Sequence, residues 1–166
     1  GIVTLLNAAG LPAAQDIASV ASTAANVIDE MGKVIDAIPT TVYGDESLKL
    51  YCSSNIARNY VRALGGFAAA GLGANGTDNK GTQWYTNGSL SFDGIPVFVA
   101  NGMADNTMVA AQTSNLYFGT SLLSDWQEAS VIPVHLYDGS DNVRVVMRMT
   151  AGAQVGIAND CVVYSV

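Results

Sequence analysis

The run Asn142-Val-Arg-Val-Val-Met-Arg-Met-Thr-Ala-Gly-Ala-Gln-Val155 decides more about the fold than any other stretch of the chain. Successive side chains of a β-strand point to opposite faces, so a strand here would separate two sets of residues. One face would carry Val143, Val145, Met147 and Met149, and the other would carry Arg144, Val146 and Arg148. This alternation predicts one long strand over Val143–Gln154.

The sequence on both sides of this strand predicts further strands, separated from it by turns. The stretch Asp138–Asn142 is rich in turn-forming residues and separates the long strand from a predicted strand at Val131–Tyr137. Downstream, Asn159-Asp160 leads into a further predicted strand at Cys161–Val166. The last third of the chain is therefore predicted to be mostly β-structure.

A hairpin is predicted upstream of this region. The pair Asp93-Gly94 lies between the apolar runs Ser89–Phe92 and Ile95–Val99, which is a strong hairpin signal. Pro96 lacks a backbone N–H and places its strand at an edge or a bulge. Two more short strands are predicted at Thr107–Ala111 and Asn115–Phe118.

The first part of the chain is predicted to be mostly helical. A short strand is expected at residues 2–6, and the apolar spacing of 3.6 residues predicts a helix from Ala13 to Ile38 that ends before Pro39. The side chains expected to face the sheet are Ile17, Val20, Ala24, Ile28, Met31 and Ile35.

A strand and a second helix are expected next. Leu48, Leu50 and Cys52 alternate with polar residues, which predicts a half-buried strand over Ser47–Cys52. The helix that follows would be capped by Ser53 or Ser54, would end at Gly65-Gly66, and would bury Ile56, Ala57, Tyr60, Val61 and Leu64. Two early helices against an antiparallel or mixed sheet make an α+β fold.

Composition excludes several classes of partner. Charged residues make up 13% of the chain, hydrophobic residues 49%, and the net charge is −7 with seven Lys plus Arg. A nucleic-acid-binding or lipid-binding surface would need a basic stripe. A chain this poor in charge is expected to cover much of its surface with other subunits. Cys52 and Cys161 are interpreted as small buried hydrophobes in a reducing compartment.

Motifs that suggest chemistry do not converge on a catalytic or metal site. The segment Gly71–Gly76 matches G-x-G-x-x-G, but the dinucleotide-binding motif needs a strand before it and a helix after it. His135 is the one histidine and lies in a predicted strand, so a zinc site lacks ligands. The acidic turn at Asp138–Asp141 lacks the pattern of a calcium loop. We therefore expect no enzymatic activity, no cofactor, no metal and no small-molecule substrate.

Four charged residues are candidates for contacts between subunits. Arg144 and Arg148 share one predicted strand face, where they either pair with acids of a neighbouring strand or subunit or remain solvated. Asp138 and Asp141 lie in the adjacent turn and are the acidic candidates.

The order of these elements resembles the major capsid proteins of tailed bacteriophages, the Hong Kong 97 capsid fold. The predicted helix ending at Ile38, the strand Leu48–Ser53 and the next helix resemble the axial domain of that family. Gly94-Ile-Pro-Val97 resembles its G-(I/L)-P-V step, and Leu116-Tyr-Phe-Gly119 followed by Ser121–Asp125 resembles its N-(L/I)-x-x-G segment. Asn142–Val155 resembles the long terminal strand of the family.

The resemblance implies a division of the chain. Residues 1–130 would form an axial-type domain, residues 131–166 the closing strands of a peripheral-type domain, and residues 65–88 a flexible loop rich in Gly and Asn. The N-terminal arm, extended loop and spine helix of the family have no counterpart here, so the chain is expected to be a fragment. Cross-linking residues are not carried over.

The resemblance also implies a function. The chain would be a structural virion protein, made in the host bacterial cytoplasm, whose copies form pentameric and hexameric capsomers of an icosahedral capsid. Two alternatives remain open at this point. One is a secreted or surface-layer β-rich adhesin-type domain, and the other is an encapsulin-like compartment shell of the same fold.

Overall fold

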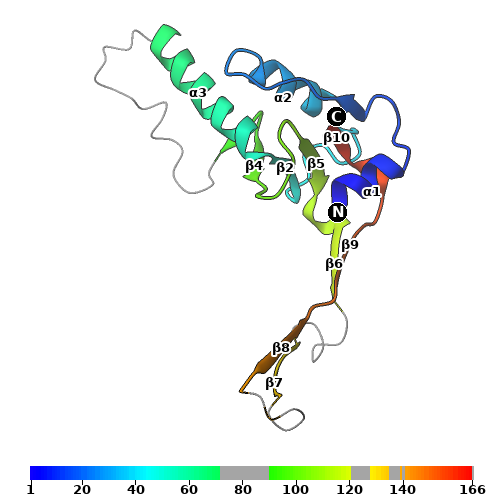
Figure 1. Cartoon of the computed structure of the whole chain (residues 1–166). Helices are drawn as coiled ribbons and strands as arrows, with labels where there is room; N and C mark the ends of the chain where they lie inside the picture. The colour runs from blue at the N-terminus through cyan, green and yellow to red at the C-terminus, as the bar shows by residue number, and fades with distance from the viewer. Residues whose placement is uncertain (72–89, 121–127, 135–138, 140, 166) are drawn as a thin grey trace. The chain divides into compact units, whose positions relative to one another are not determined.

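The computed structural model of the chain describes residues 1–71, 90–120, 128–134, 139 and 141–165 (Figure 1). It confirms the α+β class. The chain divides into two compact units, which are Gly1–Leu116 together with Val155–Val166, and Tyr117–Gln154. We describe each unit by itself.

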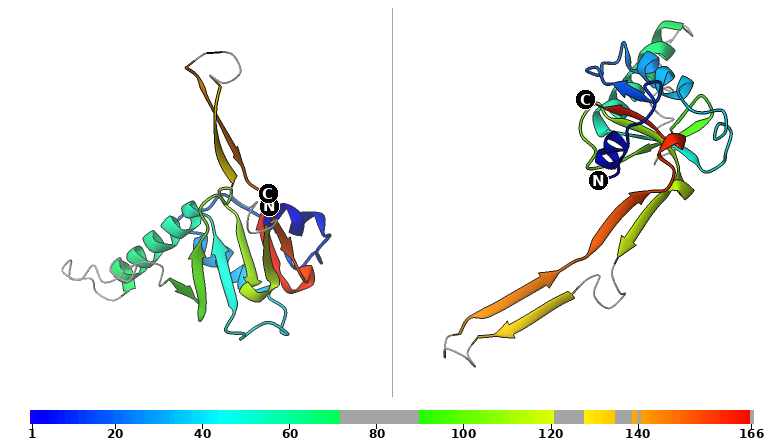
Figure 2. Two further views of the ribbon diagram at one scale, coloured as in Figure 1. Left: turned by 90° about the horizontal axis from the view of Figure 1, so that it is seen from below. Right: turned by 90° about the vertical axis from the view of Figure 1, so that its right-hand side faces the viewer.

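A six-stranded mixed sheet forms the centre of the larger unit (Figure 2). The strand order is β1-β10-β5-β2-β4-β3. Neighbours pair in parallel in β1–β10 and β2–β4, and antiparallel elsewhere. In that order the strands comprise Asp16–Ala18, Val162–Ser165, Met108–Gln112, Leu48–Cys52, Ile95–Val99 and Ser91–Phe92.

Helices cover both faces of this sheet. α2 (Val27–Asp36) and α3 (Ser54–Gly71) contribute to one buried cluster, and α1 (Ile2–Ala8) contributes to a second. Alternate residues of β5 belong to different clusters, because Met108 is buried with α2 and α3 while Val109 is buried with α1. A strand buried on both faces is mostly apolar, as β5 is up to Gln112 and β10 is up to Ser165.

Several predicted β elements are confirmed. β2 buries Leu48, Leu50 and Cys52 while its other side chains are partly exposed. The hairpin β3–β4 turns at Asp93 and Gly94, where φ is +50° and +80°. Positive φ at both turn residues is the type I′ geometry that Asp-Gly favours. Pro96 is exposed in β4, which has only the two-residue β3 beyond it.

The predictions for the first 38 residues are mostly wrong. Residues 2–6 lie in helix α1, and the predicted helix Ala13–Ile38 is replaced by β1 and the shorter α2. The physical reason is tertiary pairing, since Ile17 lies opposite Tyr164 in the β1–β10 ladder. Val20 and Ile28, which we expected to face the sheet, are 51% and 37% exposed. Of the predicted inner face of α2, Met31 and Ile35 are buried as expected.

Glycine did not end the second helix where we predicted. α3 continues through Gly65-Gly66 to Gly71, so residues 65–71 of the predicted loop are helical. The remaining part of that loop, including most of the G-x-G-x-x-G segment, lies outside the described residues. At the helix start, the Asn55 side chain accepts the backbone N–H of Ile56 at 2.9 Å, and Ser53 Oγ donates to Asn55 at 2.6 Å.

The smaller unit consists of paired strands. β6 (Leu116–Thr120) pairs with β9 (Ala151–Val155), and β7 (Glu128–Pro133) pairs antiparallel with β8 (Val143–Arg148). The predicted single strand Val143–Gln154 is therefore two strands, interrupted at Met149 and Thr150.

The expected division of the chain at about residue 130 stays a prediction, and the larger compact unit contains both ends of the chain. Residues 155–166 belong to the larger unit because β10 lies between β1 and β5 in its sheet. The axial-type and peripheral-type names for the two parts stay predictions.

Candidate functional site: an apolar face on a two-stranded hairpin

One face of the β7–β8 hairpin is composed entirely of apolar residues. The register places Ala129 opposite Met147, Val131 opposite Val145, and Pro133 opposite Val143. Residues that lie opposite each other and alternate along both strands share one face. We call this set the apolar hairpin face: Ala129, Val131, Pro133, Val143, Val145 and Met147.

The apolar hairpin face is exposed. Val131 and Met147 are 67% and 76% exposed, and Val143 and Val145 are each more than half exposed. A two-stranded hairpin alone is at best marginally stable in water, and contiguous exposed apolar patches mark protein interaction sites. The arrangement therefore favours contact with other protein along this face.

The opposite face of the hairpin carries the predicted arginines. Arg144 and Arg148 lie on the same face of β8, opposite Ile132 and Glu128 in the register. Both arginine side chains are exposed. This face carries both charged and apolar side chains, because Val146 lies between the two arginines and is only partly exposed.

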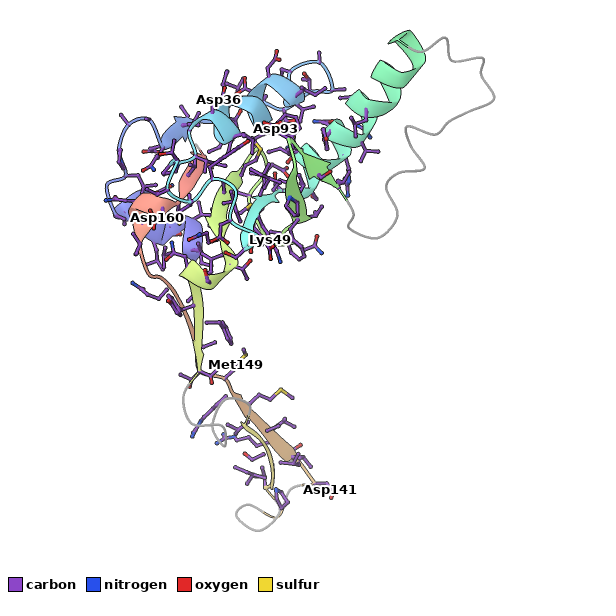
Figure 3. The ribbon with its side chains drawn as sticks, turned by 180° about the vertical axis from the view of Figure 1, so that it is seen from behind. Asp36, Lys49, Asp93, Asp141, Met149 and Asp160 are labelled. Carbon is purple, nitrogen blue, oxygen red and sulfur yellow. The ribbon has the colours of Figure 1, made fainter. Side chains whose placement is uncertain are left out.

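Of the two acidic candidates, the structure describes Asp141. Asp141 is exposed just before β8, and Figure 3 shows it at the turn end of the hairpin, with Met149 at the other end. Asp138 and His135 lie outside the described residues. The structure thus brings Arg144 and Arg148 onto one face, while the role of all four charged candidates in subunit contacts stays a prediction.

Sequence reasoning found only half of the apolar hairpin face. The alternation in β8 identified Val143, Val145 and Met147, whereas Val131 and Pro133 were not assigned a face. The missing information was the register, because a shift of one residue between the strands would turn every β7 side chain to the other face. Turn geometry sets that register, and the sequence of the turn did not specify it.

Two further exposed aromatic side chains belong to β6. Tyr117 and Phe118 are adjacent and therefore lie on opposite faces of the strand, and both are more than half exposed. They line a hollow together with Gly119, Gly152, Ala153 and Gln154. Apolar surface is thus exposed along both strand pairs of the smaller unit.

The described part of the chain was also compared with the requirements of a metal site and of a reactive thiol. In residues 1–71, 90–120 and the described segments after them, no group of three or more His, Cys, Asp or Glu side chains is placed to hold a metal ion. Burial raises the pKa of the Cys52 thiol to about 12 and that of the Cys161 thiol to about 11, so neither is a thiolate near neutral pH. In that same part of the chain, none of the helices combines the length and hydropathy needed to cross a lipid bilayer.

Comparison with solved structures identifies the fold. The chain is similar to a structure from Mycobacterium phage Che8, with a TM-score of 0.62 and 13% identity over 98% of this chain and 55% of that chain. It is also similar to a chain of the satellite phage P4 procapsid including size determination (Sid) protein, with a TM-score of 0.53 and 10% identity over 91% of this chain and 47% of that one. No family model and no curated protein matches the sequence.

These similarities confirm the expected kind of fold. The chain has a phage capsid-related fold, and at 13% and 10% identity the likeness concerns the fold alone. The chain spans about half the length of the two chains that it matches.

Proposed function

We propose that the chain is part of a structural protein of a phage virion, and that its copies self-associate into the capsid shell around the genome. The observation that carries this proposal is the phage capsid-related fold over 98% of the chain. Fold alone does not fix function, so the proposal also needs support from the surface of the molecule.

The surface supports a protein partner over a small-molecule one. The apolar hairpin face is exposed and has no charged side chain, so it is suited to burial against another protein surface. The low charged fraction of 13% supports the same conclusion, because an isolated soluble domain usually carries about 25%. We assign the partner role to other copies of the protein.

The charged candidates fit at the rim of such a contact. Arg144 and Arg148 lie on β8 and Asp141 just before it, where charges contribute more to partner choice than to affinity, and Asp138 is close to them in the sequence. The net charge of −7 argues against sequence-specific binding of nucleic acid by this chain. In this proposal the protein is made in the bacterial host cytoplasm, is located in the virion and has no enzymatic role.

Quantitative mass spectrometry of purified virions tests this proposal. The chain should be among the most abundant proteins, present in many copies per particle. A minor component, or one found only in infected-cell extract, would contradict it. A surface-layer or adhesin-type domain would be found instead at the cell surface.

A further inference from the structure

Two hollows lie at opposite ends of the parallel strand pair β2–β4 in the larger unit. Because β2 and β4 are parallel, with Leu50 opposite Val97, their first residues lie at one end of the pair and their last residues at the other. The hollow at the first end is lined by Tyr43, Gly44, Asp45, Glu46, Leu48, Asp93, Gly94, Ile95 and Pro96. The hollow at the second end is lined by Ser54, Ala57, Arg58, Val61, Arg62, Val99 and Asn101.

The first hollow is acidic. Asp45, Glu46 and Asp93 are all exposed, and the described part of the lining contains no Lys or Arg. Asp93, labelled in Figure 3, lies at the β3–β4 turn. Asp45 is held in place by a 2.7 Å hydrogen bond that it accepts from the backbone N–H of Ser47. Tyr43 adds a ring that is 52% exposed. We call this site the acidic hollow.

The second hollow is basic. Arg58 and Arg62 are exposed on α3, and among the described residues that line this hollow there is no Asp or Glu. In the described residues neither arginine forms a salt bridge, whereas Lys33 pairs with Glu30. Like charges four residues apart on a helix destabilise it slightly, so Arg58 and Arg62 do not stabilise α3 through their mutual interaction. The whole chain has seven Lys plus Arg, and two of them gather here. We call this site the basic hollow.

We propose that the exposed arginine side chains of the basic hollow in one copy contact the carboxylates of the acidic hollow in the next copy. This inference rests on the proposed function, for which it names the contact between neighbouring subunits. Arginine pairs with carboxylates through two parallel hydrogen bonds and also stacks on aromatic rings, so Arg58 and Arg62 match both the acids and Tyr43 of the acidic hollow. Arg and Tyr are also the residue types that most often dominate interface energies.

The positions of the two hollows determine the kind of assembly. β2 has five residues, which span about 13 Å from the first Cα atom to the last, so the hollows at its two ends are separate and one copy can use both at once. A contact between two different patches is heterologous, and it closes into a ring when the rotation between copies allows. A phage shell built of ring-shaped capsomers needs this type of contact, while a contact between identical patches would stop at a dimer.

Charge exchange between two variants provides the test. The first variant, Arg58→Glu with Arg62→Glu, makes the basic hollow acidic. The second variant, Asp45→Asn with Glu46→Lys and Asp93→Asn, removes the acidic character while an amide oxygen at position 45 can still accept the Ser47 N–H. Asparagine also tolerates the positive φ at position 93. The matched control, Asp16→Lys with Asp29→Lys, gives the same change in net charge as the second variant at exposed positions elsewhere.

Sedimentation velocity of this chain, from low micromolar to submillimolar concentration, measures the outcome. Each variant alone should lose about tenfold or more in association constant relative to the wild-type chain, and the control should not. An equimolar mixture of the two variants should associate again, because each then meets a hollow of opposite charge.

Three results would overturn the inference. Variants that associate as tightly as the wild-type chain would exclude the charge contact. If the same gene product still formed shells, the proposed function would stand although this contact was wrong. A mixture that fails to recover association, from variants whose circular dichroism and melting match wild type, would show that the hollows do not face each other. A wild-type chain that stays monomeric throughout the concentration range would exclude the contact as well.

Discussion

The hydroxyl of Tyr164 in β10 donates a 3.0 Å hydrogen bond to Oε2 of Glu30 in α2, and both side chains are buried. The same hydroxyl accepts the backbone N–H of Val20 at 2.9 Å. The other carboxylate oxygen of Glu30 accepts from Nζ of Lys33 at 2.7 Å. This hydrogen bond raises the pKa of Lys33, although desolvation acts in the opposite direction. The buried hydroxyl of Tyr164 thus connects β10, the last strand of the chain, to helix α2.

Removing that hydroxyl should destabilise the larger unit. In Tyr164→Phe, Glu30 and the Val20 N–H each lose a partner while buried or partly buried, which we expect to lower the free energy of unfolding by about 1–3 kcal/mol. Urea denaturation measures the change. Tyr43→Phe is the control, since Tyr43 is exposed and should change stability by less than about 0.5 kcal/mol. Equal midpoints for the two variants would show that the buried hydrogen bond contributes nothing.

The two sides of α2 should respond differently to truncation. Met31 is fully buried and Ile28 is 37% exposed on the same helix. We expect Met31→Ala to lower the free energy of unfolding by about 2–5 kcal/mol, because it leaves a cavity. Ile28→Ala should lower it by clearly less. Thermal melting of both variants checks this, and a larger loss from Ile28→Ala would mean that the helix faces the sheet with its other side.

The contrast between α2 and β2 shows what local sequence could predict. In β2 and in the β3–β4 hairpin, alternation and turn chemistry agree with the final environment, so the prediction was confirmed. Residues 13–26 have helical spacing, but Ile17 gains more by pairing beside β10, a strand about 145 positions later in the chain. The local periodicity of residues 13–26 gives no information about a pairing partner so far along the chain. The same limit hid the β7 half of the apolar hairpin face, which depends on register.

The two hollows were invisible in the sequence for a related reason. Arg58 and Arg62 were readable as one helix face, but Asp45 and Asp93 are separated by almost fifty positions and meet only because β2 and β4 are parallel neighbours. A parallel pair brings together the starts of distant strands, and single-sequence patterns do not report strand order.

The buried thiols should make stability fall at alkaline pH. The folded-state pKa values of about 12 for Cys52 and about 11 for Cys161 lie above the ~8.5 of an unfolded thiol. Their contribution is therefore fully present below about pH 8.5 and is lost as the pH rises toward the folded-state values. Unfolding in urea at pH 8 and pH 10 should show a decrease that is smaller in Cys52→Ala with Cys161→Ala. An unchanged slope in the double variant would contradict this.

Neighbouring substitutions on β7 should separate the two hairpin faces. Val131 belongs to the apolar hairpin face and Ser130 to the opposite face. Val131→Asp should reduce binding of a hydrophobic dye to the isolated chain and block shell formation, because it would bury a charge without a partner. Ser130→Asp carries the same charge and should leave dye binding nearly unchanged. Dye titration and electron microscopy measure both, and equal effects of the two variants would mean that the exposed face is not the one buried on assembly.

Electron microscopy of the product of the complete gene that encodes these 166 residues, expressed alone in bacteria, tests the central claim most directly. We expect closed shells of uniform diameter, in which rings of this chain are resolved, while the 166-residue chain by itself forms at most loose oligomers at micromolar concentration. Monodisperse, folded monomers of the complete product at every concentration would contradict the proposal that this protein builds a shell from its own copies.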